Sequence, residues 1–138
     1  MAYKLSRTSR ERLDGVHPSL IALIDYSLIG SPYDFGIPKD GGARTLERQK
    51  ELYAIGRTVD LHKAKVTWTL NSKHRIQADG YGHAFDIYAY VDGKASWNRK
   101  HLTAIANHIL KCAEELDIKI EWGGNWKSKD MPHFQLID

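Results

Sequence analysis

The chain has 138 residues, of which 42% are apolar and 27% charged, a composition typical of one globular domain that excludes a disordered or fibrous protein. Its single cysteine, Cys112, excludes an intrachain disulfide framework, so any metal ligands must come from His, Asp or Glu. The net charge of +3 is far below the basic excess of a dedicated nucleic-acid-binding protein.

Two helices are predicted in the first thirty residues. The segment Ser6–Gly15 is polar with few apolar anchors. The second helix begins near His17-Pro18, because proline suits the first helical turn, where a backbone N–H has no intrahelical partner. Its apolar residues recur at helical spacing, and Gly30 offers a stop.

The middle of the chain is predicted to hold one helix between loops. We expect a loop over Ser31–Gly42 with a short strand at Tyr33–Ile37. Thr45 can cap a helix that runs to about Ile55, with Leu46, Leu52 and Tyr53 on one face. Residues 65–70 alternate and are rich in Val, Thr and Trp, which predicts a strand, and residues 71–82 are expected to form a loop.

The last third alternates between strands and one long helix. The segment Ala84–Val91 is predicted as a strand followed by a turn at Asp92-Gly93. A helix with a continuous apolar stripe is expected from Ser96 to Leu116. Further strands are expected at residues 118–122 and 133–137. Together these elements predict an α+β domain.

Three residues are candidate metal ligands. A catalytic zinc ion takes three protein ligands and keeps one position for water. Asp86 lies in an otherwise apolar strand, where a carboxylate is costly unless it is exposed, paired or metal-bound. His133 opens the last strand, and His74 lies in the loop before Asp86. Each alone has an ordinary alternative: an outward-facing carboxylate, an exposed loop histidine and a half-buried, hydrogen-bonded histidine.

Eight short segments occur in order along nearly the whole chain: Leu13–Pro18, Ser31–Phe35, Gly42–Thr45 with Arg48-Gln49 and Leu52-Tyr53, Gly56–Thr58, Asn71–His74, His83–Asp86, Trp122–Gly124 and Asp130–Phe134. Together they resemble the zinc D-alanyl-D-alanine carboxypeptidase and dipeptidase family. Within it, the chain looks closest to the phage endolysins that are L-alanyl-D-glutamate peptidases. The resemblance implies a zinc peptidase fold of the Hedgehog and DD-peptidase type, with a small antiparallel sheet and flanking helices.

The resemblance also implies the roles of the site residues. His74, Asp86 and His133 would bind Zn²⁺. Asp130 would be the acidic catalytic residue, which takes a proton from water and returns it to the leaving amine, and Arg44 would steady the developing oxyanion.

The chain departs from the family pattern at a few positions. Asp86 follows His74 by twelve residues, a longer spacing than in short family members, so the loop Arg75–Gly82 looks inserted. His83 thereby becomes an alternative first ligand, although His74 carries the expected Ser-x-His context, in which Ser72 would support the site by hydrogen bonding. Residues 125–129 contain no acidic side chain, so calcium regulation is not expected.

The expected function is that of a phage endolysin that hydrolyses the L-alanyl-D-glutamate bond of the peptidoglycan stem peptide. A D-alanyl-D-alanine carboxypeptidase and a non-catalytic, zinc-stabilised wall-binding module are the alternatives. We expect a monomer with one peptidase domain over residues 1–138 and no separate cell-wall-binding domain. No nucleic-acid partner is expected, because the chain lacks a basic helix or an aromatic platform motif. No stable membrane insertion is expected, because no apolar run approaches ~20 residues.

The polar N-terminus also lacks the apolar core of a standard secretory signal. With this N-terminus, the resemblance to phage endolysins implies a protein made in the host cytoplasm that reaches the wall, in the periplasm, after the membrane is permeabilised.

Overall fold

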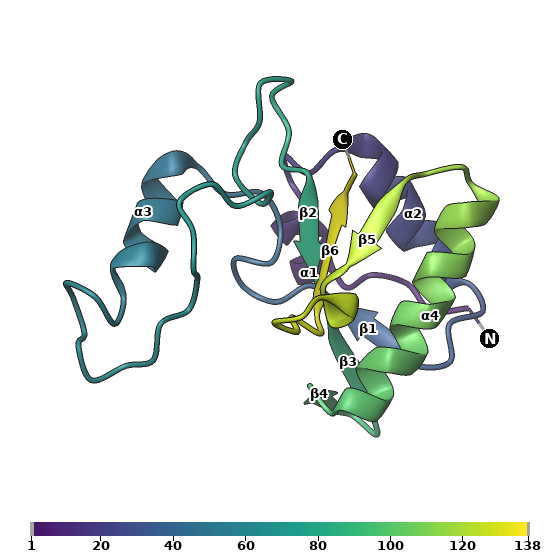
Figure 1. Cartoon of the computed structure of the whole chain (residues 1–138). Coiled ribbons are helices and arrows are strands. Elements are labelled where there is room, and N and C mark those ends of the chain that lie inside the picture. Colours follow the sequence, from purple (N-terminus) through teal and green to yellow (C-terminus); the bar gives the residue numbers. More distant parts are fainter. Residues whose placement is uncertain (1, 138) are drawn as a thin grey trace.

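The strands form two small antiparallel sheets (Figure 1). The computed structural model describes residues 2–137. One sheet has the order β1-β3-β4, and the other has the order β2-β6-β5. In chain order the strands are β1 (Asp34–Gly36), β2 (Ala84–Asp86), β3 (Tyr88–Val91), β4 (Lys94–Ser96), β5 (Ile120–Trp122) and β6 (His133–Leu136). These elements confirm the predicted α+β class.

The α-helices each begin at a polar side chain that accepts a hydrogen bond from the first turn. They are α1 (Arg7–Arg12), α2 (Pro18–Leu28), α3 (Leu46–Ala54) and α4 (Arg99–Glu115), capped by Ser6, His17, Thr45 and Asn98. A short 3-10 turn, η1 (Gly123–Asn125), follows β5. None of the helices among residues 2–137 is long and apolar enough to cross a membrane.

The core lies between the helix pair α2 and α4 and the two sheets. α4 packs against α2 and against both β3 and β5. From the second sheet, the rings of Phe85 and Phe134 stack with centroids 5.1 Å apart, and both are fully buried. This burial fixes the register of β2 on β6, because a shift of one residue would turn every side chain to the other face.

The predicted strand Ala84–Val91 is present but broken at Ile87. Ile87 is fully buried, and its N–H donates to the carbonyl of Pro132 at 3.0 Å. The break passes the chain from the second sheet, as β2, to the first sheet, as β3. Asp86 is therefore the last residue of β2 and lies at the end of a strand, whereas the sequence predicted it in the middle of one.

Three predictions about local structure were wrong. Residues 65–70 form no strand, because their polar groups bond to side chains from α3 and its C-terminal loop (Gln49 and Arg57) instead of a neighbouring strand. Ser96 does not begin the long helix but ends β4, which pairs with β3 after the turn at Asp92 and Gly93. Leu46 was predicted to share one face of the third helix with Leu52 and Tyr53, but it is exposed. The buried residues of α3 are Gln49 and Leu52.

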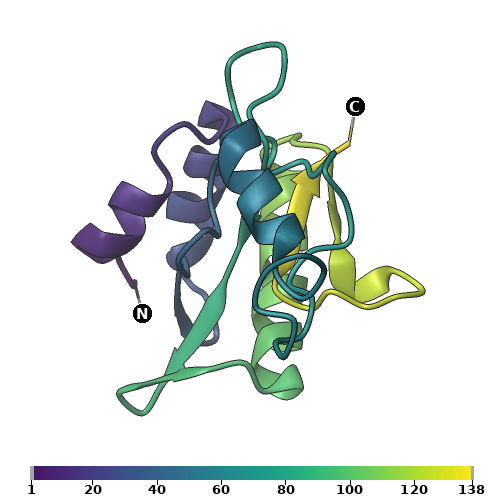
Figure 2. The same ribbon diagram turned by 90° about the vertical axis from the view of Figure 1, so that its left-hand side faces the viewer.

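The reason for this last difference is the position of α3. The helix and the chain after it lie to one side of the two sheets, and Figure 2 views the molecule from that side. Only a narrow stripe of the α3 surface, at Gln49 and Leu52, is therefore buried against the rest of the protein.

Candidate metal centre

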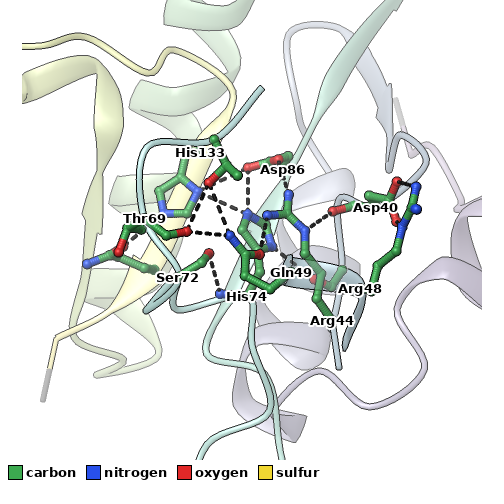
Figure 3. A network of polar contacts seen from close by, with 12 residues as sticks. Asp40, Arg44, Arg48, Gln49, Thr69, Ser72, His74, Asp86 and His133 are labelled. Atoms are coloured by element: carbon green, nitrogen blue, oxygen red, sulfur yellow. Dashed lines mark hydrogen bonds and ion pairs between the residues drawn. The ribbon is translucent and has the colours of Figure 1, made fainter. Parts of the chain in front are cut away.

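Three side chains from separate parts of the chain meet at the end of β2 (Figure 3). Asp86 and His133 are opposite each other in the β2–β6 ladder, and His74 arrives from the loop between α3 and β2. His74 Nε2 and His133 Nδ1 each lie 3.1 Å from Asp86 Oδ1 and 3.2 Å from each other. The structure thus brings together the three ligands expected from the sequence.

The backbone around His74 fixes its ring. The Ser72 hydroxyl accepts a hydrogen bond from the His74 N–H at 3.1 Å. This bond is of the kind that the sequence predicted, in which Ser72 supports the site. The buried ring places Nδ1 2.9 Å from the carbonyl oxygen of Gly42. Because a carbonyl oxygen only accepts, Nδ1 carries the proton and donates it. The tautomer with its single proton on Nδ1 therefore turns the lone pair of Nε2 toward Asp86 and His133.

The ring of His133 is fixed in the same way by side chains of the second sheet. Its Nε2 lies 2.8 Å from Gln135 Oε1, and Gln135 Nε2 donates to Glu121 Oε1 at 2.8 Å. Since the Glu121 carboxylate accepts, the amide of Gln135 must turn its oxygen to His133, and His133 Nε2 donates. The lone pair of Nδ1 then faces the cluster.

Two imidazole lone pairs and a carboxylate oxygen thus converge on one point. Such an arrangement is electrostatically unfavourable unless a cation lies between them. The separations of 3.1–3.2 Å are close to the roughly 3.3 Å between ligands of a tetrahedral ion with bonds of about 2.0 Å. The donor set and the groups behind it fit a divalent metal ion, and among residues 2–137 this is the group of metal-competent side chains that converges in this way.

The electrostatics of the cluster favour positive charge. Burial opposes ionisation of Asp86, but when no metal is bound and the two rings carry protons toward it, the charge of His74 and hydrogen bonds from both histidines lower the pKa of Asp86 overall. Burial also opposes protonation of His133, yet its hydrogen bond with Asp86 raises its pKa. The site therefore stabilises a cation, whether a proton or a metal ion.

Arg44 lies beside the cluster, held from two sides. Its Nε donates to the carbonyl of Asp40 at 2.9 Å, and its Nη1 donates to Gln49 Oε1 at 3.0 Å. Its Nη2 lies 3.9 Å from Asp86 Oδ2. Burial lowers the pKa of Arg44 while the charges of Asp86 and Asp40 oppose this, and arginine stays charged regardless.

Gln49 is a part of this site to which the sequence analysis assigned no role. It is fully buried on α3, and its Nε2 donates to Thr67 Oγ1 at 3.1 Å and to the Thr69 carbonyl at 2.7 Å. Every polar atom of its amide is thereby satisfied, and its oxygen is directed at Arg44. The available signal was its place three residues before Leu52, on the buried face of a short helix.

Asp130 lies in the loop before β6. Its carbonyl accepts from the His133 N–H at 3.2 Å, and its side chain remains exposed to solvent. Partial desolvation and the charge of Asp86 raise its pKa, while the charges of His133, His74 and Arg44 act in the opposite direction. The carboxyl group of Asp130 is thus near enough for the charges of the other candidate site residues to act on it.

The Trp122-Gly123-Gly124 segment places Asp130. Trp122 Nε1 donates to the carbonyl of Met131 at 2.6 Å, and the Gly123 carbonyl accepts from the Asp130 N–H at 2.9 Å. A Cβ on Gly123 would lie 2.9 Å from that of Asp130, and one on Gly124 would collide with the Trp122 ring. Glycine is therefore required at position 123, where the chain approaches Asp130, and at position 124, where it approaches the Trp122 ring.

His83, the alternative first ligand, lies apart from the cluster. Its Nε2 is 2.7 Å from Asp79 Oδ2 in the inserted loop, and its ring meets that of His17 edge-on at 5.6 Å. His74, and not His83, therefore accompanies Asp86 and His133.

The comparisons agree on one kind of protein. The family model described as phage L-alanyl-D-glutamate peptidase matches residues 1–136. The fold is similar to the crystal structure of the L-Ala D-Glu endopeptidase ChiX from Serratia marcescens, with a TM-score of 0.75 and 35% sequence identity. That match covers 97% of this chain and 90% of the Serratia chain. No curated protein sequence matches the chain.

Proposed function

The chain belongs to the phage L-alanyl-D-glutamate peptidase family and is a peptidoglycan endopeptidase, and from this premise we propose that it is a zinc enzyme with Asp130 and Arg44 as its catalytic residues. Its substrate is then the stem peptide, cut between L-alanine and D-glutamate. His74, Asp86 and His133 would hold the metal.

The observation that carries this proposal is the convergence of three lone pairs at one point. Both histidines are fixed from behind, by the Gly42 carbonyl and the Gln135 amide, in the tautomer that a metal ion needs. Nitrogen and carboxylate ligands in a set of three favour zinc with one open position. When bound, zinc would supply a Lewis acid that polarises the amide carbonyl and makes water more acidic.

Asp130 would move the proton in this reaction. Its raised pKa and exposed side chain suit a carboxylate that accepts a proton from the attacking water and later donates it to the leaving amine of D-glutamate. Negative charge then collects on the former carbonyl oxygen. The guanidinium of Arg44 would stabilise that charge. Because Asp40 and Gln49 already hold it in place, the side chain would not have to move during the reaction.

The wider setting follows from the family, whose phage endolysins act on the bacterial cell wall. We propose that the protein acts as a monomer and reaches the wall from the host cytoplasm after another protein permeabilises the inner membrane.

Mass spectrometry of digested peptidoglycan tests the assignment of the bond. Purified sacculi treated with the zinc-loaded protein should release peptides with a new N-terminal D-glutamate. Free D-alanine would instead indicate a D-alanyl-D-alanine carboxypeptidase. Binding to sacculi with zinc present and no product at all would indicate a wall-binding module and contradict the proposal.

A further inference from the structure

The segment after α3 carries exposed side chains that the proposed chemistry does not use. We call residues 55–73, which lie to one side of the sheets in Figures 1 and 2, the arm. Leu61, Val66 and Trp68 on the arm are all exposed. The Trp68 side chain, 77% exposed, is the most exposed large hydrophobic residue of the part of the chain that the structure describes.

Trp68 is held in place by cationic neighbours. The Arg57 guanidinium lies 3.7 Å from the centroid of the Tyr53 ring and 5.7 Å from that of Trp68. Lys65 Nζ lies 5.5 Å from the Trp68 ring. Arg57 also donates to the carbonyls of Tyr53 and Thr67, at 2.6 and 3.0 Å, which ties the arm to the end of α3. The indole is thus an exposed platform with positive charge beside it.

The platform is connected through Gln49 to Arg44, one of the proposed catalytic residues. Thr67 and Thr69, the two neighbours of Trp68, both accept hydrogen bonds from Gln49. The oxygen of Gln49 in turn accepts from Arg44, as the dashed lines in Figure 3 show. One amide therefore sets the position of both Arg44 and the backbone that carries Trp68.

The chemistry of the substrate indicates what this platform would meet. In peptidoglycan the L-alanine of the stem is joined directly to the lactyl group of a muramic acid sugar. The scissile L-alanyl-D-glutamate bond is therefore one residue from the glycan strand, and one residue spans at most about 3.6 Å. An enzyme that cuts this bond in the intact polymer must accommodate sugar rings close to its catalytic centre.

The charge of the arm suits the same polymer. Between residues 57 and 73 there are four cationic side chains and one carboxylate, Asp60, which pairs with Lys63 at 3.5 Å. The stem peptides attached to the glycan carry several carboxylates. A cationic, aromatic surface attracts such a chain and lets the apolar face of a sugar ring pack on the indole.

We propose that Trp68, with Lys65 beside it, forms a subsite for the glycan strand of peptidoglycan, occupied by the sugar that bears the stem peptide or its neighbour. This inference rests on the proposed function, since it assigns the position of the glycan from the bond that is cut. Trp68 is then a specificity residue that distinguishes the polymer from free stem peptide.

Two substrates and two tryptophan variants test the subsite. Trp68→Ala and the control Trp97→Ala, an exposed tryptophan between β4 and α4 that packs on Tyr88, are assayed on disaccharide-linked stem peptide and on sugar-free stem peptide. W68A should lose about tenfold in kcat/KM on the disaccharide substrate, mainly through KM, and nothing on the sugar-free peptide. W97A should match the wild type on both, and Trp68→Phe should recover most of the loss.

Equal losses on both substrates, or no loss on either, would overturn the glycan subsite while the wild type still confirms the peptidase. Failure of the wild type on both substrates would instead count against the proposed function. Binding of peptide-free glycan strands, measured by calorimetry on the zinc-loaded protein, separates the two proposals, because it needs no catalysis. Binding by wild type and W97A but not by W68A supports the subsite, and equal or absent binding by all three contradicts it.

Discussion

At the scale of single residues, the proposed metal centre depends on the groups behind the imidazoles as much as on the imidazoles themselves. The amide of Gln135 holds the proton of His133 on Nε2, and the carbonyl of Gly42 does the same for Nδ1 of His74. Gln49 has the equivalent role for Arg44. The side chains of Gln135 and Gln49 can each be changed without removing a proposed ligand or catalytic residue.

Substitution of Gln135 by Leu should weaken zinc binding about 10- to 100-fold. The His133 Nε2–H then loses its acceptor, so neither the tautomer nor the ring orientation is fixed. Competition with a chromophoric chelator measures the affinity. Gln77→Leu is the control, because the side-chain amide of Gln77 donates to the carbonyls of Ser72 and Arg75 and to neither histidine ring. An unchanged affinity for Q135L would argue against this role of Gln135.

Substitution of Gln49 by the similarly shaped Met should lower kcat about tenfold and leave the zinc stoichiometry at one. The side chain no longer accepts from Arg44, so the guanidinium loses one of its two anchors. If Gln49 acts through Arg44, the effect should disappear in an Arg44→Ala background. Additive losses in the double variant would show that Gln49 acts by another route.

At the scale of elements, the sequence predicts those parts whose structure is determined locally. The helix that begins at Pro18 follows from proline in the first turn and from apolar spacing, and it is present. The strand predicted over Ala84–Val91 is also present, as β2 and β3 on either side of Ile87. The alternation in residues 65–70 suggested a strand, but alternation cannot reveal whether a partner strand exists. Here Gln49 and Arg57 bond the carbonyls instead. The approach of His74 to His133 also depends on the tertiary fold, and only the resemblance to a family could connect them.

The turn after β5 provides a test at this scale. Alanine at Gly123 places a Cβ against the backbone of Asp130, which should destabilise the fold by about 1–3 kcal/mol and displace Asp130. Activity below the melting temperature should therefore fall well beyond the loss of folded protein. Gly93→Ala is the control: its φ of 76° makes alanine strained, but no atom lies within 4 Å of the new Cβ. If both variants lose activity only in proportion to unfolding, Gly123 does not position Asp130.

At the scale of the whole molecule, acid should remove a contribution to stability from the loop before α3. Arg48 donates to both oxygens of Asp40, at 3.0 and 2.8 Å, and these hydrogen bonds lower the pKa of Asp40 despite partial burial. A folded-state pKa below the unfolded value of about 3.9 means that the stabilisation is present above pH 4 and is lost as the pH falls through the folded pKa.

Asp40→Asn is the matching variant, because Asn tolerates the left-handed backbone at this position, where φ is 62°. Urea unfolding at pH 7 should show a variant less stable by about 1 kcal/mol or less, with the gap closing below pH 4. A gap that is independent of pH would show that the carboxylate charge is not the cause.

Zinc itself should stabilise the whole fold, since the proposed site would join three segments far apart in sequence through one ion. At a free zinc concentration a hundred times the dissociation constant, the linkage is about 2.7 kcal/mol. Chelation should therefore lower the melting temperature by several degrees, and readdition of zinc should restore it. The His74→Ala protein should melt at the same temperature with and without the chelator. A wild type that is indifferent to chelation would contradict a metal centre at this position.

The most direct test of the account compares zinc content and turnover in the same preparations of wild type, Asp130→Asn and His133→Ala. We expect one zinc per chain in the wild type and in D130N, with turnover of sacculi in D130N reduced about a thousandfold. H133A should lose both zinc and turnover. A D130N protein that digests sacculi at the wild-type rate, or an H133A protein that keeps its zinc, would contradict the proposed division between metal ligands and proton carrier.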